Sequence, residues 1–272
     1  MFAFDFMCSA AGKALARYLT CPNPNHLPLA TADPDSLRAA LRPGDVLLVE
    51  GNTRISTAVK YLTQSTWSHA ALYVGELESV AGDGPEAKVL IEADLVEGVW
   101  AVPLSTYLNM HTRICRPVGL SEGDIARVLD FAVASLGRKY DLKNIIDLMR
   151  YLLPTPPVPT HVRRRMLTLG SGEPTSAICS TLIAQAFQSV RYPILPIRHR
   201  TGGNRETFSI RHYSLFTPRD FDISPYFRVI KPPIEEGFDF HAMRWSEDAA
   251  ALGAQLFVDA RSAISGTSLP GR

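Results

Sequence analysis

The sequence predicts an α+β fold in which helices pack on a small antiparallel sheet. Short apolar runs typical of strands, separated by Gly and Asp turns, fill residues 45–118. Stretches with apolar residues at helical spacing lie between the first two of these runs and after the last one, and the chain contains no internal repeat. With 272 residues, 46% hydrophobic and 20% charged, the chain fits one elaborated domain with terminal additions.

The first half of the chain is predicted to supply most of the sheet. A Pro-Gly turn begins a strand over residues 45–50, and "TRISTAVKYLTQ" follows as a helix because Ile55, Val59 and Leu62 recur at helical spacing. Four further strands are predicted in "SHAALYVG", "KVLIEADL", "GVWAVPL" and "TRICRPV". Their spacing and turns indicate an antiparallel meander.

The second half is predicted to be mainly helical. "SEGDIARVLDFAVASLG" is predicted as a helix, because Ser121 is a good N-cap, Asp124 follows three residues later and Gly137 ends the pattern. "YDLKNIIDLMRYLL" forms a second helix, stopped by prolines, and residues 177–190 form a third. The chain is then irregular until "YFRVI", a last strand, and "SEDAAALGAQLFVDARSAI" is one more helical pattern.

These elements divide the chain into three parts. Residues 1–40 are an N-terminal extension with a loop rich in Pro and Asn, residues 41–231 are the folded domain, and residues 232–272 are a C-terminal extension that is partly helical. The first residues lack the basic start and long apolar run of a secretory signal, and no stretch has the length of a membrane span. We therefore expect a cytoplasmic protein, with peripheral membrane association left open.

Charge and cysteine usage narrow the function classes. The net charge of +1 favours neither nucleic acid nor membrane as a partner, although residues 161–230 hold ten arginines and no lysine against four acids. The four cysteines have irregular spacing without a C-x-x-C pair: Cys8, Cys21, Cys115 and Cys179. This spacing is typical neither of a disulfide scaffold nor of a zinc site, so free thiols are predicted.

Cys179 is the first candidate for chemistry. If Ser176 is the N-cap, this thiol lies in the first turn of the helix over residues 177–190, where free backbone N–H groups and the helix dipole favour a thiolate. The same N–H groups suit a developing oxyanion. The alternative is a buried core cysteine, because this helix is amphipathic and cysteine is among the most buried residue types.

A histidine and a carboxylate on two predicted strands are the other candidates. His69 shares a strand face with Ala71 and begins its strand beside small residues that leave room for a partner. Glu92 is unusual within a strand, and from the next strand it would orient the second nitrogen of His69. The alternatives are a structural histidine and a solubilising edge charge, and Asp94 and His111 are alternates for the third position.

Together, a thiol, an imidazole and a carboxylate are the parts of an activated-nucleophile site. The same side chains would suit zinc, but no other spacing in the chain indicates a metal. We therefore predict neither a metal nor a cofactor.

At this point the motifs resemble a known family. "RPGDVLLVEG", "WSHAALYVG", "VLIEADLVEGV", "LGRKYD" and "ICSTLIAQAF" together are similar to the permuted papain-like cysteine hydrolases of the NlpC superfamily, the YiiX/YaeF-like group. In that group, as in lecithin retinol acyltransferase-like proteins, the histidine strand precedes the cysteine helix. The resemblance spans residues 41–230 and implies a circularly permuted papain-like fold for the domain 41–231.

The resemblance also implies roles for individual residues. Cys179 would be the nucleophile, His69 the general base and acid, and Glu92 the orienting group. "SLGRKYD" resembles the LG-x-x-Y element of NlpC-type enzymes, which implies that Tyr140 lies near the substrate or the oxyanion. The chain departs from the family patterns in two places: "AICS" replaces "DCSG", and the acyltransferase motif "NCEHF" is absent, which weakens a lipid acyltransferase assignment.

The leading functional prediction is a cysteine hydrolase that cleaves an amide bond in a peptide or acyl-amide through a thioester acyl-enzyme. One alternative is a lipid acyltransferase or phospholipase-like thiol enzyme, whose Arg-rich region 161–211 would contact anionic membrane surfaces. The other is a non-catalytic module that binds a partner or small amide, although such a module has no need of all three side chains. No nucleic-acid partner is predicted, and the substrate and oligomeric state are left open.

Overall fold

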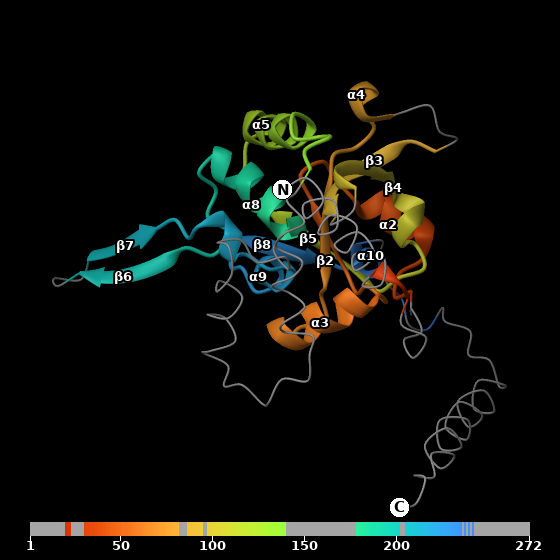
Figure 1. The fold of residues 1–272 in the computed structure, drawn as a ribbon, viewed down its shortest axis with the longest axis horizontal. Helices are drawn as coiled ribbons and strands as arrows, with labels where there is room; N and C mark the ends of the chain where they lie inside the picture. The colour runs from red at the N-terminus through yellow and green to blue at the C-terminus, as the bar shows by residue number, and fades with distance from the viewer. Residues whose placement is uncertain are drawn as a thin grey trace, which may run out of the picture. The chain divides into compact units, whose positions relative to one another are not determined.

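The computed structural model describes residues 20–22, 30–81, 86–94, 97–139, 178–201 and 205–235, together with three single residues, Gly237, Asp239 and His241. The chain divides into two compact units, residues 1–236 and 237–272, and the first contains the central sheet and the helices around it (Figure 1). The helices predicted at 140–153 and 246–264 lie outside the described residues, as do Cys8 and Tyr140.

A six-stranded antiparallel sheet forms the centre of the fold, in the order β4-β3-β2-β1-β5-β8. All six strands are confirmed at the positions that the sequence predicts. They are β1 (Val46–Val49), β2 (His69–Tyr73), β3 (Lys88–Asp94), β4 (Gly98–Pro103), β5 (Thr112–Pro117) and β8 (Phe227–Ile230).

The predicted meander is correct only from β1 to β4. Strand β5 does not pair with β4; it returns to the far side of β1, where Val46 lies opposite Cys115. The short 3-10 helix η1 (Leu104–Tyr107) stands between β4 and β5 in the chain. Turn spacing reports only local connections, and a strand that crosses to a distant partner leaves no mark in it.

The helices predicted around residues 54, 121 and 177 are confirmed as α3 (Arg54–Thr63), α5 (Glu122–Val133) and α8 (Ile178–Ser189). Ser121 and Asp124 form the predicted capping box of α5, whereas the helix itself ends at Val133 and a turn continues to Gly137. Among the described residues, four short α-helices and a hairpin are additional to the predicted elements: α2 (Pro34–Ala40), α4 (Glu78–Ala81), α9 (Pro218–Asp222), α10 (Pro232–Glu235), and β6 (Ile197–Thr201) with β7 (Arg205–Ser209).

The hairpin corrects the expectation of an irregular segment before β8. Strands β6 and β7 pair only with each other, and Figure 1 shows them extending away from the central sheet. Their sequences are rich in arginine and lack the apolar alternation by which strands are recognised. Helix α2 likewise forms at the end of the predicted N-terminal extension, where the Asp33 side chain caps it by accepting from the backbone N–H groups of Asp35 and Ser36.

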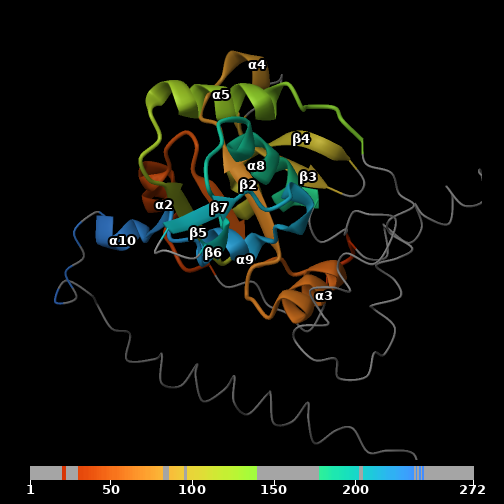
Figure 2. The ribbon, with the colours of Figure 1, turned by 90° about the vertical axis from the view of Figure 1, so that its left-hand side faces the viewer.

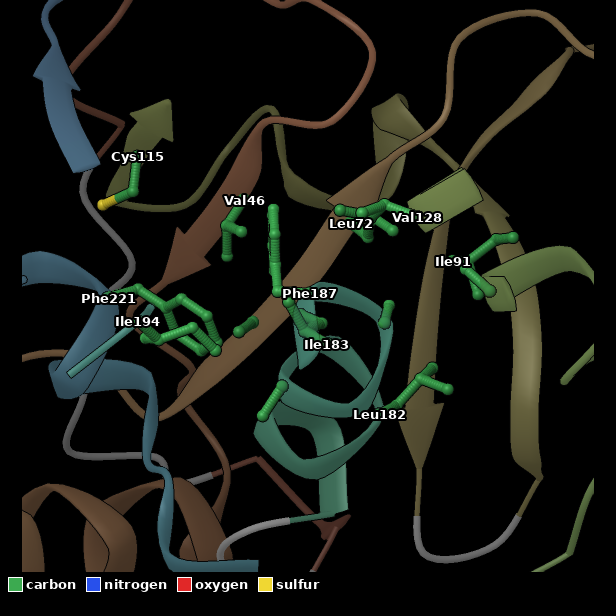
Figure 3. Close-up of a cluster of buried hydrophobic side chains, with 14 of the residues drawn as sticks. Val46, Leu72, Ile91, Cys115, Val128, Leu182, Ile183, Phe187, Ile194 and Phe221 are labelled. Atoms are coloured by element: carbon green, nitrogen blue, oxygen red, sulfur yellow. The ribbon is translucent and has the colours of Figure 1, made fainter. Parts of the chain in front are cut away.

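Two apolar clusters cover the two faces of the sheet. The first lies between the sheet and α8, where Ile183 and Phe187 meet strand side chains such as Leu72 (Figure 3). The second lies on the opposite face and includes Ala71 of β2 and Tyr107 of η1. Each fully buried side chain of this size contributes about 1.5–3 kcal/mol relative to exposure. The burial of α8 therefore fixes the helix that carries Cys179, and Figure 2 shows it lying against β2.

Trp67, the aromatic residue just before the histidine strand, is buried in the first cluster, and its indole N–H donates to Asp222 at 3.1 Å.

Among the helices of the described residues, none combines the length and the apolar character needed to cross a bilayer. The domain boundaries at residues 41 and 231 stay a prediction.

Candidate active site

Three elements bring the predicted site residues together. His69 is the first residue of β2, Glu92 lies on the neighbouring strand β3, and Cys179 is the second residue of α8. Helix α8 packs on the face of the sheet that carries Ala70 and Leu72. Because His69 stands where β2 begins, its ring and the start of the helix meet at the end of the sheet.

His69 and Glu92 form a direct pair. The distance from His69 Nε2 to Glu92 Oε2 is 2.8 Å, and the two side chains are 22% and 6% exposed. Burial by itself lowers the pKa of His69, but the charges and hydrogen bonds of Glu92 and Cys179 outweigh it and hold that pKa well above its ordinary value. Burial likewise acts to raise the pKa of Glu92, but the charge of His69 and the hydrogen-bond donors around the carboxylate outweigh it, so that this pKa lies below its ordinary value.

The Cys179 thiol lines the same pocket as His69, lies close enough to feel its charge, and is only 6% exposed. Burial acts to raise the pKa of this thiol, but the charge of His69 and the hydrogen bonds from His69, the Ala70 backbone N–H and the Ser180 hydroxyl lower it below its ordinary value. The lowered pKa of the thiol and the raised pKa of the imidazole favour a thiolate–imidazolium pair.

The predicted alternates for the third position have other partners. The Nδ1 atom of His111 lies 3.0 Å from Glu50, and its ring lies 4.9 Å from that of Trp67. The Asp94 carboxylate accepts a hydrogen bond from the backbone N–H of Glu97 at 3.1 Å. Of the three acidic and imidazole candidates, Glu92 is the one whose side chain contacts His69.

Sequence reasoning missed Tyr107. Its hydroxyl donates to Glu92 Oε2, the same oxygen that faces His69, and Tyr107 is 7% exposed. The Trp100 side chain also acts to lower the pKa of Glu92. Nothing in the local sequence "LSTYLN" marks the tyrosine, because its contact arises only when η1 packs against the sheet.

The side chains of His69, Glu92 and Cys179 line a pocket of about 240 Å³. Asp94 and Tyr107 also line it, and much of the remaining wall comes from the segment after β1 and from α3. Gly51 belongs to this wall, and its backbone N–H donates to the Ser68 hydroxyl at 2.9 Å. The apolar lining residues are Val49, Ile55, Val59, Ala93 and Met110.

Gly51 has no room for a side chain. A Cβ atom at this position would lie 2.3 Å from the Ser56 hydroxyl and 3.0 Å from that of Ser68.

Within the described part of the chain, no group of three or more His, Cys, Asp or Glu side chains is arranged to hold a metal ion.

Comparison with known proteins yields a family match and a structural likeness. A family model described as "Permuted papain-like amidase enzyme, YaeF/YiiX, C92 family" matches residues 40–151, a stretch that contains His69 and Glu92 and ends before Cys179. Among solved structures, the crystal structure of the metalloprotein yiiX from Escherichia coli O157:H7 shares 14% identity and a TM-score of 0.43, over 71% of this chain and 97% of that chain. No curated protein matches the chain.

The family match includes the histidine strand and the carboxylate strand of the site. The match supports a hydrolase of the amidase type in general terms. It assigns no role to an individual side chain. Over residues 40–151 the chain is thus similar to the permuted papain-like amidases of the YaeF/YiiX, C92 family, which confirms the resemblance and the α+β fold class predicted from its motifs.

Proposed function

We propose that this chain is a cysteine hydrolase that cleaves an amide bond through a thioester acyl-enzyme. The observation that carries the proposal is that the Cys179 thiol shares one pocket with the His69 ring, which is itself paired with the Glu92 carboxylate at 2.8 Å. The match to a family of amidases supports the class of bond.

The reaction begins from the thiolate–imidazolium pair. The Cys179 thiolate attacks the carbonyl carbon of the amide, and the carbonyl oxygen takes up negative charge. The sequence predicts Cys179 in the first turn of its helix, where backbone N–H groups are suited to stabilise this oxyanion. The His69 imidazolium then gives its proton to the leaving amine, and a thioester remains on Cys179.

A second half-reaction restores the enzyme. Neutral His69 takes a proton from water, the resulting hydroxide attacks the thioester, and the acid product leaves with Cys179 again a thiolate. Because Nε2 of His69 is engaged by Glu92 at 2.8 Å, Nδ1 is the ring nitrogen that serves the sulfur and the water. Glu92 thus fixes the orientation of the ring and compensates its positive charge in both steps.

Alkylation of the native protein across pH, with each thiol followed by mass spectrometry, tests the activated thiolate. Cys179 is expected to react with iodoacetamide well below pH 8, and a His69→Ala variant is expected to lose that reactivity. Two other thiols serve as internal references: Cys21 is exposed, and Cys115 is buried, with its pKa raised by desolvation. A Cys179 thiol that reacts no faster than Cys21 at pH 6.5 would refute the proposal.

The bond class needs a separate experiment. We expect wild-type protein, and not Cys179→Ser, to release amine from a panel of acyl-amides and short peptides. An acyltransferase would pass the acyl group from the same thioester to an acceptor other than water, so mass analysis of the acyl product separates the two reactions. A panel of phospholipid esters tests the lipid alternative in the same assay, with and without anionic vesicles.

A further inference from the structure

The Glu92 carboxylate is held from more than one side. Within the described residues, the groups that act on it come from β2, η1 and β4: His69, Tyr107 and Trp100. Tyr107 in turn is acted on by the charges of Glu92, Cys179 and Asp94. A carboxylate this deeply buried keeps its charge only when several donors face it.

Tyr107 stands out among these groups. Its hydroxyl donates to the same oxygen, Oε2, that accepts from His69 Nε2, and the rings of Tyr107 and His69 lie 5.9 Å apart. The tyrosine sits in the pocket wall but belongs to the apolar cluster on the far face of the sheet from α8. It therefore supports the carboxylate from the side opposite to the nucleophile helix.

We propose that Tyr107 is a positioning residue that keeps the Glu92 carboxylate ionised and aligned with His69. This inference rests on the proposed function, because it assigns Tyr107 a role only through the Cys179–His69–Glu92 site. Tyr107 contributes no proton to the reaction: its hydroxyl stays protonated, since burial first and the charge of Glu92 second raise the pKa of Tyr107 well above its ordinary value.

Removing the Tyr107 hydroxyl should change the pH dependence of Cys179 reactivity in a definite direction. Without this donor the pKa of Glu92 rises, so the carboxylate is neutralised at a higher pH when the solution is acidified. A neutral Glu92 no longer stabilises the His69 imidazolium, and the Cys179 thiolate loses its cationic partner. The acid limb of the pH profile for Cys179 reactivity should therefore move to higher pH.

The test measures the alkylation rate of Cys179 against pH in wild type and Tyr107→Phe. We expect the midpoint of the acid limb to rise by about one pH unit, the shift expected from losing one hydrogen bond to a charged group. Loss of packing alone would lower or raise the rate at all pH values without moving the midpoint. An unmoved midpoint in Tyr107→Phe overturns the inference.

Tyr192→Phe is the matched control. Tyr192 is 9% exposed, close to the 7% of Tyr107, and its hydroxyl donates to the backbone carbonyl of Val118 at 2.9 Å, within the same compact unit. The same hydroxyl also accepts from the Val118 backbone N–H at 2.8 Å and lies 2.5 Å from the Tyr226 carbonyl, so removing it costs at least as much hydrogen bonding, all of it away from Glu92. The control should leave the midpoint in place, and an equal shift in Tyr192→Phe would show that Tyr107 acts only through general stability.

Two further variants keep the test decisive. Site-specific 3-fluorotyrosine at position 107 is a stronger donor of nearly the same shape, so the midpoint should move to lower pH. In a Glu92→Gln background, Tyr107→Phe should add no shift, and an undiminished shift there would overturn the role through Glu92. The wild-type profile alone tests the proposed function: if Cys179 is not activated in wild type, the catalytic proposal fails first, whatever the Tyr107 variants do.

Discussion

The substitution Glu92→Gln tests the charge interaction between Glu92 and His69 in the proposed site. The substitution keeps the shape of the side chain and removes the charge that lies 2.8 Å from His69 Nε2. At an effective dielectric constant of about 20, the gross attraction across that distance is roughly 6 kcal/mol. Much of this is offset by the cost of burying both groups, so a net loss of about 1.5–3 kcal/mol, typical of hydrogen bonds to charged groups, is the better expectation.

That loss corresponds to about one to two pKa units. In Glu92→Gln the pKa of His69 falls and, because the imidazolium is less populated, the pKa of Cys179 rises. At pH 6.5 we expect the alkylation rate of Cys179 to fall by about ten- to a hundredfold. The wild-type and variant rates should converge at high pH, where both thiols are ionised without help.

A second glutamate–histidine pair supplies the control. Glu50 lies 3.0 Å from Nδ1 of His111, and Glu50 is part-buried with its side chain 21% exposed. Glu50→Gln removes a similar carboxylate from a similar imidazole, and it should leave the pH profile of Cys179 unchanged. The reasoning is refuted if Glu92→Gln leaves the rate at pH 6.5 intact, or if Glu50→Gln lowers it equally.

Three other predictions concern stability and the pocket. Cys115→Ser replaces a fully buried thiol by a hydroxyl and should lower the free energy of unfolding by about 1–3 kcal/mol in urea titrations, with Cys179 alkylation unchanged. Gly51→Ala forces a Cβ against the Ser56 and Ser68 hydroxyls and should cost about 1–3 kcal/mol while slowing Cys179 alkylation by bulky electrophiles more than by iodoacetamide. Phe187→Ala should lower the free energy of unfolding by about 3–5 kcal/mol, and an unchanged midpoint in urea would contradict the role given to the α8 core.

The pH dependence of stability offers a further check on the paired charges. Because the pKa of Glu92 is lowered in the folded state, its ionised form contributes stability above the ordinary glutamate pKa, and this contribution is lost as pH falls through the lowered value. Because the pKa of His69 is raised, its contribution is present below the ordinary histidine pKa and is lost as pH rises through the raised value. Thermal melts of wild type against Glu92→Gln should differ most between about pH 5 and 6, roughly midway between these ordinary values.

Local patterns in the sequence determined most of the elements. Apolar runs bounded by turns located all six strands of the central sheet, and the Ser121–Asp124 spacing located the capping box of α5. These signals suffice because strand and helix periodicity and N-cap chemistry involve residues only a few positions apart. The return of β5 to β1 depends instead on contacts between residues more than sixty positions apart, such as Val46 and Cys115.

For the candidate site, too, some features were determined by the sequence and others only by the tertiary structure. The sequence by itself determined the side chains with the right chemistry, because a cysteine at a helix start, a histidine at a strand start and a glutamate within a strand are each recognisable locally. Only the tertiary structure decided that Glu92, and not Asp94 or His111, contacts His69, because that choice follows from strand pairing and from side-chain direction. Tyr107 reaches Glu92 only because η1 packs on the sheet, so the contact that holds the carboxylate has no signature in the sequence around it.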